Sequence, residues 1–240
     1  MLKKYNAWKE RLPKFWAEVI DWVEILVIAA AIAAFMNNVI IANSQVPTGS
    51  MEETIMVGDR VIGSRLAYTF GEPKRGDVAI FKFGWKCNRC NMAMGEGTAP
   101  EICPYCNKEI THPKTVYYVK RVIGLPGDTV EIKAGGSCAQ SEIVSEAADS
   151  VQLSGEGADK PLITAAVYVN GEKLTEDYLR EPMLYTGDMT FTVPEDSYFM
   201  MGDNRNNSLD ARYWNNHYIP KEKMIAKVLF RYWPGIKIVK

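Results

Sequence analysis

The chain has 240 residues, of which 47% are hydrophobic and 24% are charged, as in ordinary globular proteins. This length suffices for one sizeable core plus a membrane anchor, or for two small domains. A net charge of −1 provides no overall positive field, so the composition argues against a nucleic-acid partner. The charge is unevenly distributed, because the first fourteen residues contain five Lys and Arg residues and a single acid.

An apolar run follows this basic segment. Ile25–Met36 contains no polar residue, and the stretch from 22 to 42 is long enough to cross a bilayer core. We therefore predict a basic cytoplasmic segment over residues 1–21, a single transmembrane anchor over residues 22–42, and a remainder on the outer side. A cleaved signal peptide is the first alternative, although the residues just after the run look functional. A buried amphipathic helix is the second, although no polar stripe interrupts the run.

Residues 43–240 contain short β-rich runs separated by Gly, Pro and Asp turn signals. This pattern predicts a mainly β fold with an antiparallel, barrel-like or sandwich domain. The pair Asn170–Gly171 predicts a type I′ hairpin turn. Two insertions interrupt the pattern: residues 85–110 carry four cysteines, and residues 134–165 form a polar surface insertion. The predicted strands are Arg60–Ile62, Asp77–Phe83, Thr115–Ile123, Thr129–Ile132, Ala166–Val169, Met189–Val193, Tyr198–Met201 and Lys227–Trp233.

A serine follows the apolar run in the segment Pro47–Met51, which reads PTGSM. Proline and glycine restrict and turn the backbone there, so the turn can present the Ser50 hydroxyl to solvent. The alternative is a plain juxtamembrane loop, in which serine and glycine are common.

A serine hydroxyl needs a base to become a good nucleophile. The two histidines, His112 and His217, have no distinctive context, so a Ser-His-Asp triad is unsupported. Lys120 lies in an apolar β-rich segment, where burial lowers a lysine pKa from about 10.4 toward 7–8. On a regular strand Lys120 and Arg121 face opposite ways, so one points inward while the other reaches water. The alternative is that both are exposed on an edge strand.

A third polar segment, 202–212, is dense in Gly, Asn, Asp and Arg. A surface turn is one interpretation. The other is a loop that braces an active site, with Ser208 near the lysine amine and an Asp210–Arg212 pair that fixes the loop.

These segments, in this order, resemble the type I signal peptidase (leader peptidase) family. That family pattern has an N-terminal membrane span, a P-S-G-S-M-like nucleophile segment, a G-D-x-V strand, and the motifs K-R-x-x-G-x-P-G-D and G-D-N-R-x-x-S-x-D-S-R. The likeness covers most of the chain outside the two insertions. The corresponding segments are PTGSM at 47–51, GDVAIF at 76–81, KRVIGLPGD at 120–128 and GDNRNNSLDAR at 202–212.

The resemblance implies a role for each matching residue. Ser50 attacks the scissile carbonyl, and Lys120 acts as the general base. Ser208 orients the lysine amine, while Asp210 and Arg212 support the site. The oxyanion hole combines the Ser50 backbone N–H with the hydroxyl of Thr48.

The implied activity is that of a membrane-bound serine endopeptidase that removes N-terminal signal peptides from exported preproteins. Cleavage after small residues, at sites of the Ala-x-Ala type, is expected, with no cofactor for catalysis. The implied location is the inner or plasma membrane, crossed once, with the N-terminus cytoplasmic and the catalytic domain outside. The expected partners are secretory preproteins, membrane lipid and the export translocon nearby.

The cysteine insert departs from the family pattern. Two C-x-x-C pairs can bind one tetrahedral metal ion, which predicts a small zinc-ribbon-like insertion with structural zinc. Disulfides are the alternative, because the insert is expected outside the cytoplasm. Cys138 is interpreted as a free or incidental thiol. The four predicted metal ligands are Cys87, Cys90, Cys103 and Cys106.

Two other functions fit parts of the sequence. One is a related Ser–Lys protease with a narrower task, such as maturing a pilin-like subunit or cutting itself. The other is a membrane-tethered zinc-ribbon binding module without catalysis. Function retained after Ser50→Ala would support the binding module rather than either protease.

Overall fold

The computed structural model describes residues 9, 12–95, 99–143 and 161–240. The chain divides into two compact units, one ending at Ile41 and one beginning at Ala42. We describe each unit by itself.

The first unit contains helix α2, Lys14–Phe35, which continues as one π-helical turn, Met36–Ile40. Pro13 precedes the helix, where a missing N–H costs no helical hydrogen bond. The 27 residues from Lys14 to Ile40 are long and apolar enough to cross a membrane, and the helix buries none of its side chains within the chain. The helix begins eight residues before the predicted start of the anchor, and Ile41 and Ala42 belong to the first strand instead.

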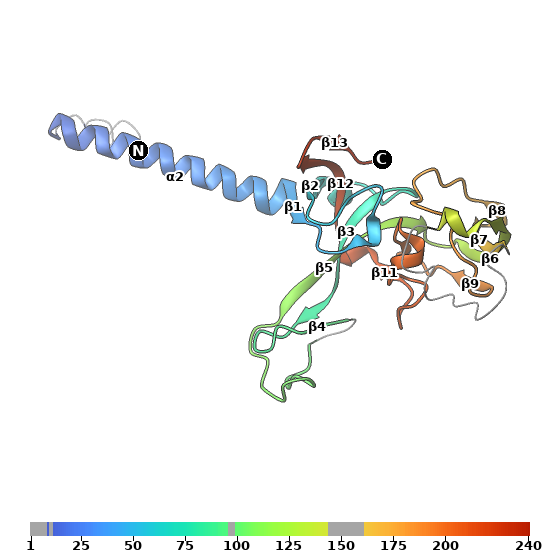
Figure 1. Ribbon diagram of the computed structural model, residues 1–240. Coiled ribbons are helices and arrows are strands. Elements are labelled where there is room, and N and C mark those ends of the chain that lie inside the picture. Colours follow the sequence, from blue (N-terminus) through green and yellow to red (C-terminus); the bar gives the residue numbers. More distant parts are fainter. Residues whose placement is uncertain (1–8, 10–11, 96–98, 144–160) are drawn as a thin grey trace. The chain divides into compact units, whose positions relative to one another are not determined.

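The second unit is mainly antiparallel β-structure (Figure 1). Among the described residues, the larger sheet has nine strands, and its main path runs β1-β2-β12-β3-β5-β10-β11, with β13 on β12 and β4 on β3. Its strands are β1 Ile41–Gln45, β2 Arg60–Ser64, β3 Val78–Lys86, β4 Ala93–Met94, β5 Lys114–Gly124, β10 Ser197–Met201, β11 Ile219–Pro220, β12 Met224–Trp233 and β13 Lys237–Ile238. Helix α3, Leu66–Thr69, follows β2.

The smaller sheet has the order β8-β7-β6-β9. Its strands are β6 Thr129–Cys138, β7 Leu162–Val169, β8 Glu172–Lys173 and β9 Met189–Thr192. Asn170 and Gly171 join β7 to β8 with φ of 53° and 83°, the positive pair that a type I′ turn requires. The predicted hairpin turn is therefore confirmed.

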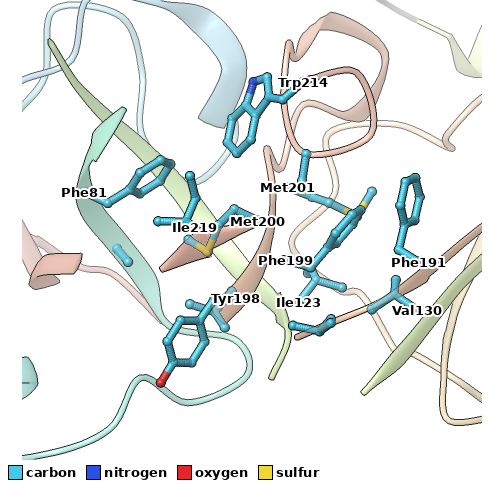
Figure 2. Close-up of a cluster of buried hydrophobic side chains, with 14 of the residues drawn as sticks. Phe81, Ile123, Val130, Phe191, Tyr198, Phe199, Met200, Met201, Trp214 and Ile219 are labelled. Atoms are coloured by element: carbon cyan, nitrogen blue, oxygen red, sulfur yellow. The ribbon is translucent and has the colours of Figure 1, made fainter. Parts of the chain in front are cut away.

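The largest apolar cluster among the described residues contains side chains from both sheets. Figure 2 shows Phe81 of β3, Ile123 of β5, Val130 of β6, Phe191 of β9 and side chains of β10 meeting in this core. The β10 residues contribute most, since Tyr198, Phe199, Met200 and Met201 are all buried. The second half of β5, residues 120–124, is buried, which matters for the residues that it carries.

All eight predicted strands are present, and β8 is the second strand of the predicted Asn170–Gly171 hairpin. The short strands β1, β4, β11 and β13 were not predicted. Strands β6 and β7 extend further than expected, through residues 134–138 and 162–165 of the predicted polar insertion. Residues 144–160 of that insertion lie outside the described residues. The cysteine insert is attached where β3 ends and β5 begins, with Lys86 paired to Lys114.

Candidate active site

Ser50 lies in a short 3-10 turn, Gly49–Met51. The next side chain, Met51, is 1% exposed and packs in a second apolar cluster with Ile55, Val61 and Ile80. This buried methionine anchors the turn to the larger sheet, while Ser50 itself remains half-buried. The local sequence thus combines a core anchor with an accessible hydroxyl.

Asn204 holds this turn in place with two hydrogen bonds. Its backbone N–H donates to the Ser50 carbonyl over 3.1 Å, and its side-chain amide donates to the Gly49 carbonyl over 3.0 Å. The adjacent Gly202 has no room for a side chain, because a Cβ there would overlap Ser208 and the Ser50 carbonyl. The segment 202–212 therefore packs against the turn that carries Ser50, and Asn204 is a candidate site residue that the sequence reasoning did not single out.

Lys120 lies on β5 and is 3% exposed. Its Nζ donates a hydrogen bond to Ser208 Oγ over 2.9 Å. Burial is the main cause that lowers the pKa of Lys120 to about 8, with Arg212 acting in the same direction and Asp210 and Asp203 opposing it. The predicted contact between Ser208 and the lysine amine is present, and the amine is desolvated as a lysine base requires.

The expectation that one of Lys120 and Arg121 would reach water is wrong. Arg121 is 2% exposed, and its guanidinium forms a two-pronged ion pair with the buried Asp203, at 2.8 and 2.6 Å. Thr54 also donates to Asp203, and the Tyr178 ring lies 3.8 Å from the Arg121 guanidinium. Both faces of β5 are covered at Lys120 and Arg121, so the two side chains point to opposite faces and neither reaches solvent.

The predicted pair of Asp210 and Arg212 is present and buried. The guanidinium donates to both carboxylate oxygens at 2.8 and 2.9 Å, and the Gly202 N–H donates to the same carboxylate over 3.0 Å. Burial acts to raise the pKa of Asp210, but Arg212, the Gly202 N–H and Lys120 together outweigh it and hold that pKa below the ordinary value. Arg212 also donates to the Arg205 carbonyl, which ties the polar loop together.

A groove of about 440 Å³ joins these segments. Its walls come from the nucleophile segment 44–51, from residues 116–120 of β5, and from Asn207 and Leu209. Ser50, Thr48 and Lys120 all line it, so the structure brings three of the predicted site residues to one cavity.

One edge of β5 is free along this groove. Strand β5 pairs with β3 over its residues 114–121, and on its other side with β10 only at residues 121–124. In the described part of the chain, no strand pairs with that second edge between Lys114 and Lys120. An open edge of this kind can accept an additional extended chain.

The contacts of the two histidines are with parts of the chain other than the turn that carries Ser50. His112 is exposed in the loop before β5. His217 Nδ1 lies 2.5 Å from the Ala211 carbonyl, and its ring packs against Phe191. Neither ring lines the groove of Ser50.

The four paired cysteines form one cluster. Their Sγ atoms all lie within 4.8 Å of one another, with 3.9 Å between Cys87 and Cys106 and 3.7 Å between Cys90 and Cys103. None of the chain's five cysteines, all within the described ranges, forms a disulfide. Cys138 is buried apart from this cluster, with Ile143 and Leu162.

The two cysteine turns repeat the same backbone pattern. In each turn, the N–H four residues after the first cysteine donates to that cysteine's carbonyl, from Asn91 to Cys87 and from Asn107 to Cys103. Both asparagines have positive φ, at 64° and 53°. Such paired turns point two thiols from each side toward one centre, which is the donor set of a structural zinc site.

The sequence is similar to those of known proteins. A family model described as "Signal peptidase, peptidase S26" matches residues 19–233. A signal peptidase I of Leptolyngbya laminosa is 26% identical over 92% of this chain and 83% of its own length. One from Pseudomonas aeruginosa is 34% identical over 74% of this chain and 57% of its own length.

A probable signal peptidase I of Synechocystis is 28% identical over 89% of this chain and 74% of its own length. The family match runs through most of the apolar helix and through the β domain. The chain therefore belongs to the signal peptidase family, peptidase S26, the serine endopeptidases that remove signal peptides from preproteins.

Proposed function

We propose that this enzyme cuts preproteins with a Ser–Lys dyad, in which Ser50 is the nucleophile and Lys120 the general base. The observation that carries the proposal is a buried lysine amine, with its pKa lowered to about 8 by desolvation, that lines the same groove as Ser50. A base whose pKa lies near the working pH can both accept and return a proton during turnover. An ordinary lysine, with a pKa of about 10.4, would stay protonated.

The reaction divides into two acyl-transfer steps. Lys120 takes the proton of the Ser50 hydroxyl while Oγ bonds to the scissile carbonyl carbon. The resulting oxyanion accepts hydrogen bonds from the Ser50 N–H and the Thr48 hydroxyl, and each such donor contributes about 2.7–4 kcal/mol. The Lys120 ammonium then gives its proton to the leaving amine as the C–N bond breaks. A water molecule then gives a proton to Lys120 while its oxygen bonds to the acyl carbon. The bond between that carbon and Ser50 Oγ breaks, and Lys120 returns the proton to Oγ.

The other site residues position this dyad. Ser208 accepts a hydrogen bond from the Lys120 amine and thereby fixes its direction. Asp210 and Arg212 hold the loop that carries Ser208 through their buried ion pair. Asn204 fixes the carbonyls of Gly49 and Ser50, and with them the orientation of the Ser50 N–H.

The preprotein binds as an extended strand along the free edge of β5, with small residues at −1 and −3 facing the groove. Helix α2 anchors the enzyme in a lipid bilayer with the N-terminus cytoplasmic and the catalytic domain, from residue 43 onward, outside. This location places the enzyme beside the translocon, where signal peptides emerge.

The dyad is tested by cleavage of a synthetic Ala-x-Ala precursor. Ser50→Ala and Lys120→Ala are each expected to abolish cleavage, while both proteins still accumulate in membranes. The wild-type kcat/KM is expected to rise with pH up to about 8, since the base works in its neutral form. Unimpaired cleavage by the Lys120 variant would exclude the mechanism. Cleavage of several unrelated precursors, rather than one, separates a general peptidase from a dedicated one.

We also propose that the cysteine cluster binds structural zinc. In a tetrahedral site with Zn–S bonds of about 2.3 Å, the sulfur ligands lie roughly 3.8 Å apart. The Sγ atoms of Cys90 and Cys103 are 3.7 Å apart, and those of Cys87 and Cys106 are 3.9 Å apart. All four ligand positions are filled by protein, so the ion supplies no catalytic step. It joins the two cysteine turns, whose own apolar cluster is small and contains Trp85 and Ile110.

Elemental analysis of the purified enzyme tests this assignment. One zinc per chain is expected, and Cys106→Ser is expected to lose it. Cys138→Ser is the matched control, because Cys138 lies outside the cluster. Stoichiometric disulfides without metal in the purified protein would favour the alternative of two cross-links.

A further inference from the structure

A salt bridge outside the groove reaches the turn that carries Ser50. Glu52 lies two residues after the nucleophile, and its Oε2 accepts a hydrogen bond from Nη1 of Arg180. Arg180 belongs to the segment between β8 and β9, 128 positions away in the chain. The two side chains are largely covered, with 20% of Glu52 and 29% of Arg180 exposed. Neither residue lines the groove, so the pair lies outside the surface assigned to the substrate.

The Glu52 carboxylate lies directly against the residue before the nucleophile. Its Oε1 is 2.6 Å from the position that a Cβ on Gly49 would occupy, so the missing side chain of Gly49 leaves room for it. Its Oε2 accepts a hydrogen bond of 3.4 Å from the side-chain amide of Asn204, and the same amide donates to the Gly49 carbonyl over 3.0 Å. The other end of that amide, Oδ1, is buried and has no hydrogen-bond partner in the described part of the chain. The orientation of the amide therefore depends on these two acceptors.

The Gly49 carbonyl and the Ser50 N–H belong to one peptide group. A trans peptide group is planar, so its carbonyl oxygen and its N–H point in opposite directions. The Gly49 carbonyl accepts hydrogen bonds from the Glu52 N–H, over 3.1 Å, and from the Asn204 amide. Holding this carbonyl therefore fixes the direction of the Ser50 N–H, which is the proposed oxyanion donor.

Arg180 also balances a charge that would oppose the reaction. In the transition state a negative charge develops on the oxygen that faces the Ser50 N–H. A carboxylate held against Gly49 repels that charge unless a cation is paired with it. The guanidinium of Arg180 supplies this cation from the side of Glu52 that faces away from the groove lining.

The segment that carries Arg180 is fixed on both sides of it. Before Arg180, the Glu176 carboxylate accepts two hydrogen bonds from the buried Arg205, at 2.9 and 2.5 Å. After Arg180, the Glu181 carboxylate accepts a hydrogen bond from Asn206 over 2.7 Å. The guanidinium therefore extends from backbone that is already held in place, which lowers the entropic cost of keeping it on Glu52.

We infer that Arg180 is a positioning residue for the oxyanion hole, which acts through Glu52 on the peptide group between Gly49 and Ser50. This inference rests on the proposed roles of Ser50 as nucleophile and of its N–H as oxyanion donor. Arg180 holds the Glu52 carboxylate against Gly49 and neutralises its charge. The carboxylate in turn keeps the Asn204 amide on the Gly49 carbonyl, so the Ser50 N–H faces the developing oxyanion.

The test measures kcat and KM for a synthetic Ala-x-Ala precursor in detergent micelles. Arg180→Gln is expected to lower kcat about tenfold with KM unchanged, because the unbalanced Glu52 carboxylate then opposes the oxyanion. Glu52→Gln keeps an oxygen that accepts from Arg180 and Asn204, so its kcat should stay within about threefold of wild type. The double variant contains no unbalanced carboxylate, and its kcat should match that of Glu52→Gln. Arg180→Lys keeps the positive charge and should lose less activity than Arg180→Gln.

Lys133→Gln is the matched control. Lys133 also pairs with a glutamate of similar exposure, Glu131, whose side chain is 21% exposed on strand β6 of the smaller sheet. This variant should leave kcat unchanged. The rise of kcat/KM toward pH 8 should also persist in Arg180→Gln, because that rise belongs to Lys120.

Four outcomes would overturn the inference. They are a wild-type kcat in Arg180→Gln, an equal loss of kcat when Arg180→Gln is added to Glu52→Gln, a rise in KM alone, and a displaced pH profile. If Arg180→Gln does not fold, as judged by tryptophan fluorescence, the double variant is compared with Glu52→Gln, and a tenfold lower kcat in the double variant counts against the inference. Ser50→Ala is measured in parallel. Cleavage by Ser50→Ala would remove the proposed nucleophile, whereas an inactive Ser50→Ala beside a fully active Arg180→Gln would remove only the role of Arg180.

Discussion

Replacing Lys120 with methionine should inactivate the enzyme and yet stabilise its fold. The pKa of Lys120 is about 8 in the folded protein, against 10.5 for an unburied lysine. At 1.36 kcal/mol per pKa unit, the charged amine lowers the free energy of unfolding by about 3 kcal/mol at pH 7. Methionine removes this cost and retains most of the packing. It also removes the hydrogen bond to Ser208, worth about 1 kcal/mol, so a net gain of about 2 kcal/mol is expected.

The pH dependence of the free energy of unfolding distinguishes removal of the buried charge from improved packing as the cause of the gain in stability. Between pH 8 and 10.5, the unfolded wild-type chain holds a proton on Lys120 that the folded chain does not, so wild-type stability rises with pH. The advantage of Lys120→Met should therefore shrink by about 3 kcal/mol across this window. Urea unfolding in micelles at pH 7 and above pH 10, followed by tryptophan fluorescence, measures the difference.

Lys82→Met is the control, because Lys82 is an exposed lysine on the neighbouring strand β3. It should change the free energy of unfolding by less than about 0.5 kcal/mol at either pH. A Lys120→Met protein that is less stable than wild type at pH 7, or whose advantage does not vary with pH, would refute the reasoning.

Two further substitutions probe the loop around the dyad. Gly202→Ala should remove most activity, measured as kcat, because the added methyl group would overlap Ser208 Oγ. Gly235→Ala is the control and should leave kcat unchanged, because a methyl group there meets no atom within 4 Å. Asp203→Asn should lower the free energy of unfolding by about 3–5 kcal/mol, because it leaves the Arg121 guanidinium buried without its counter-charge. Urea unfolding measures this loss. The control Glu72→Gln breaks an exposed ion pair with Lys221 and should lower the free energy of unfolding by less than about 1 kcal/mol. Equal losses for the two variants would contradict the prediction.

The sequence predicted the strands and the dyad candidates because both depend on local pattern. Alternating apolar residues and turn signals identify a strand whatever its neighbours are. The burial of Lys120 followed from the apolar residues on either side of it. The burial of Arg121 could not be predicted in this way, because its partner Asp203 lies 82 positions away. The local pattern also does not show that both faces of β5 are covered at this point.

The other differences have similar causes. The start of α2 at Lys14 was missed because charged residues at the first turns do not prevent a helix, and hydropathy alone places the boundary too late. The bracing by Asn204 depends on two backbone carbonyls of a distant turn, which no spacing in the sequence encodes. The convergence of the four cysteines, in contrast, follows from C-x-x-C spacing, which already brings two thiols to one side of a turn.

The attachment of the cysteine insert at a single pair of residues has an evolutionary consequence. Lys86 and Lys114 face each other across β3 and β5, so the insert leaves and rejoins the sheet at points about 5 Å apart. A short hairpin turn could close the same gap without shifting the register of either strand. A genetic event that adds or removes the whole segment would therefore leave the pairing of β3 with β5, and with it the position of Lys120, unchanged.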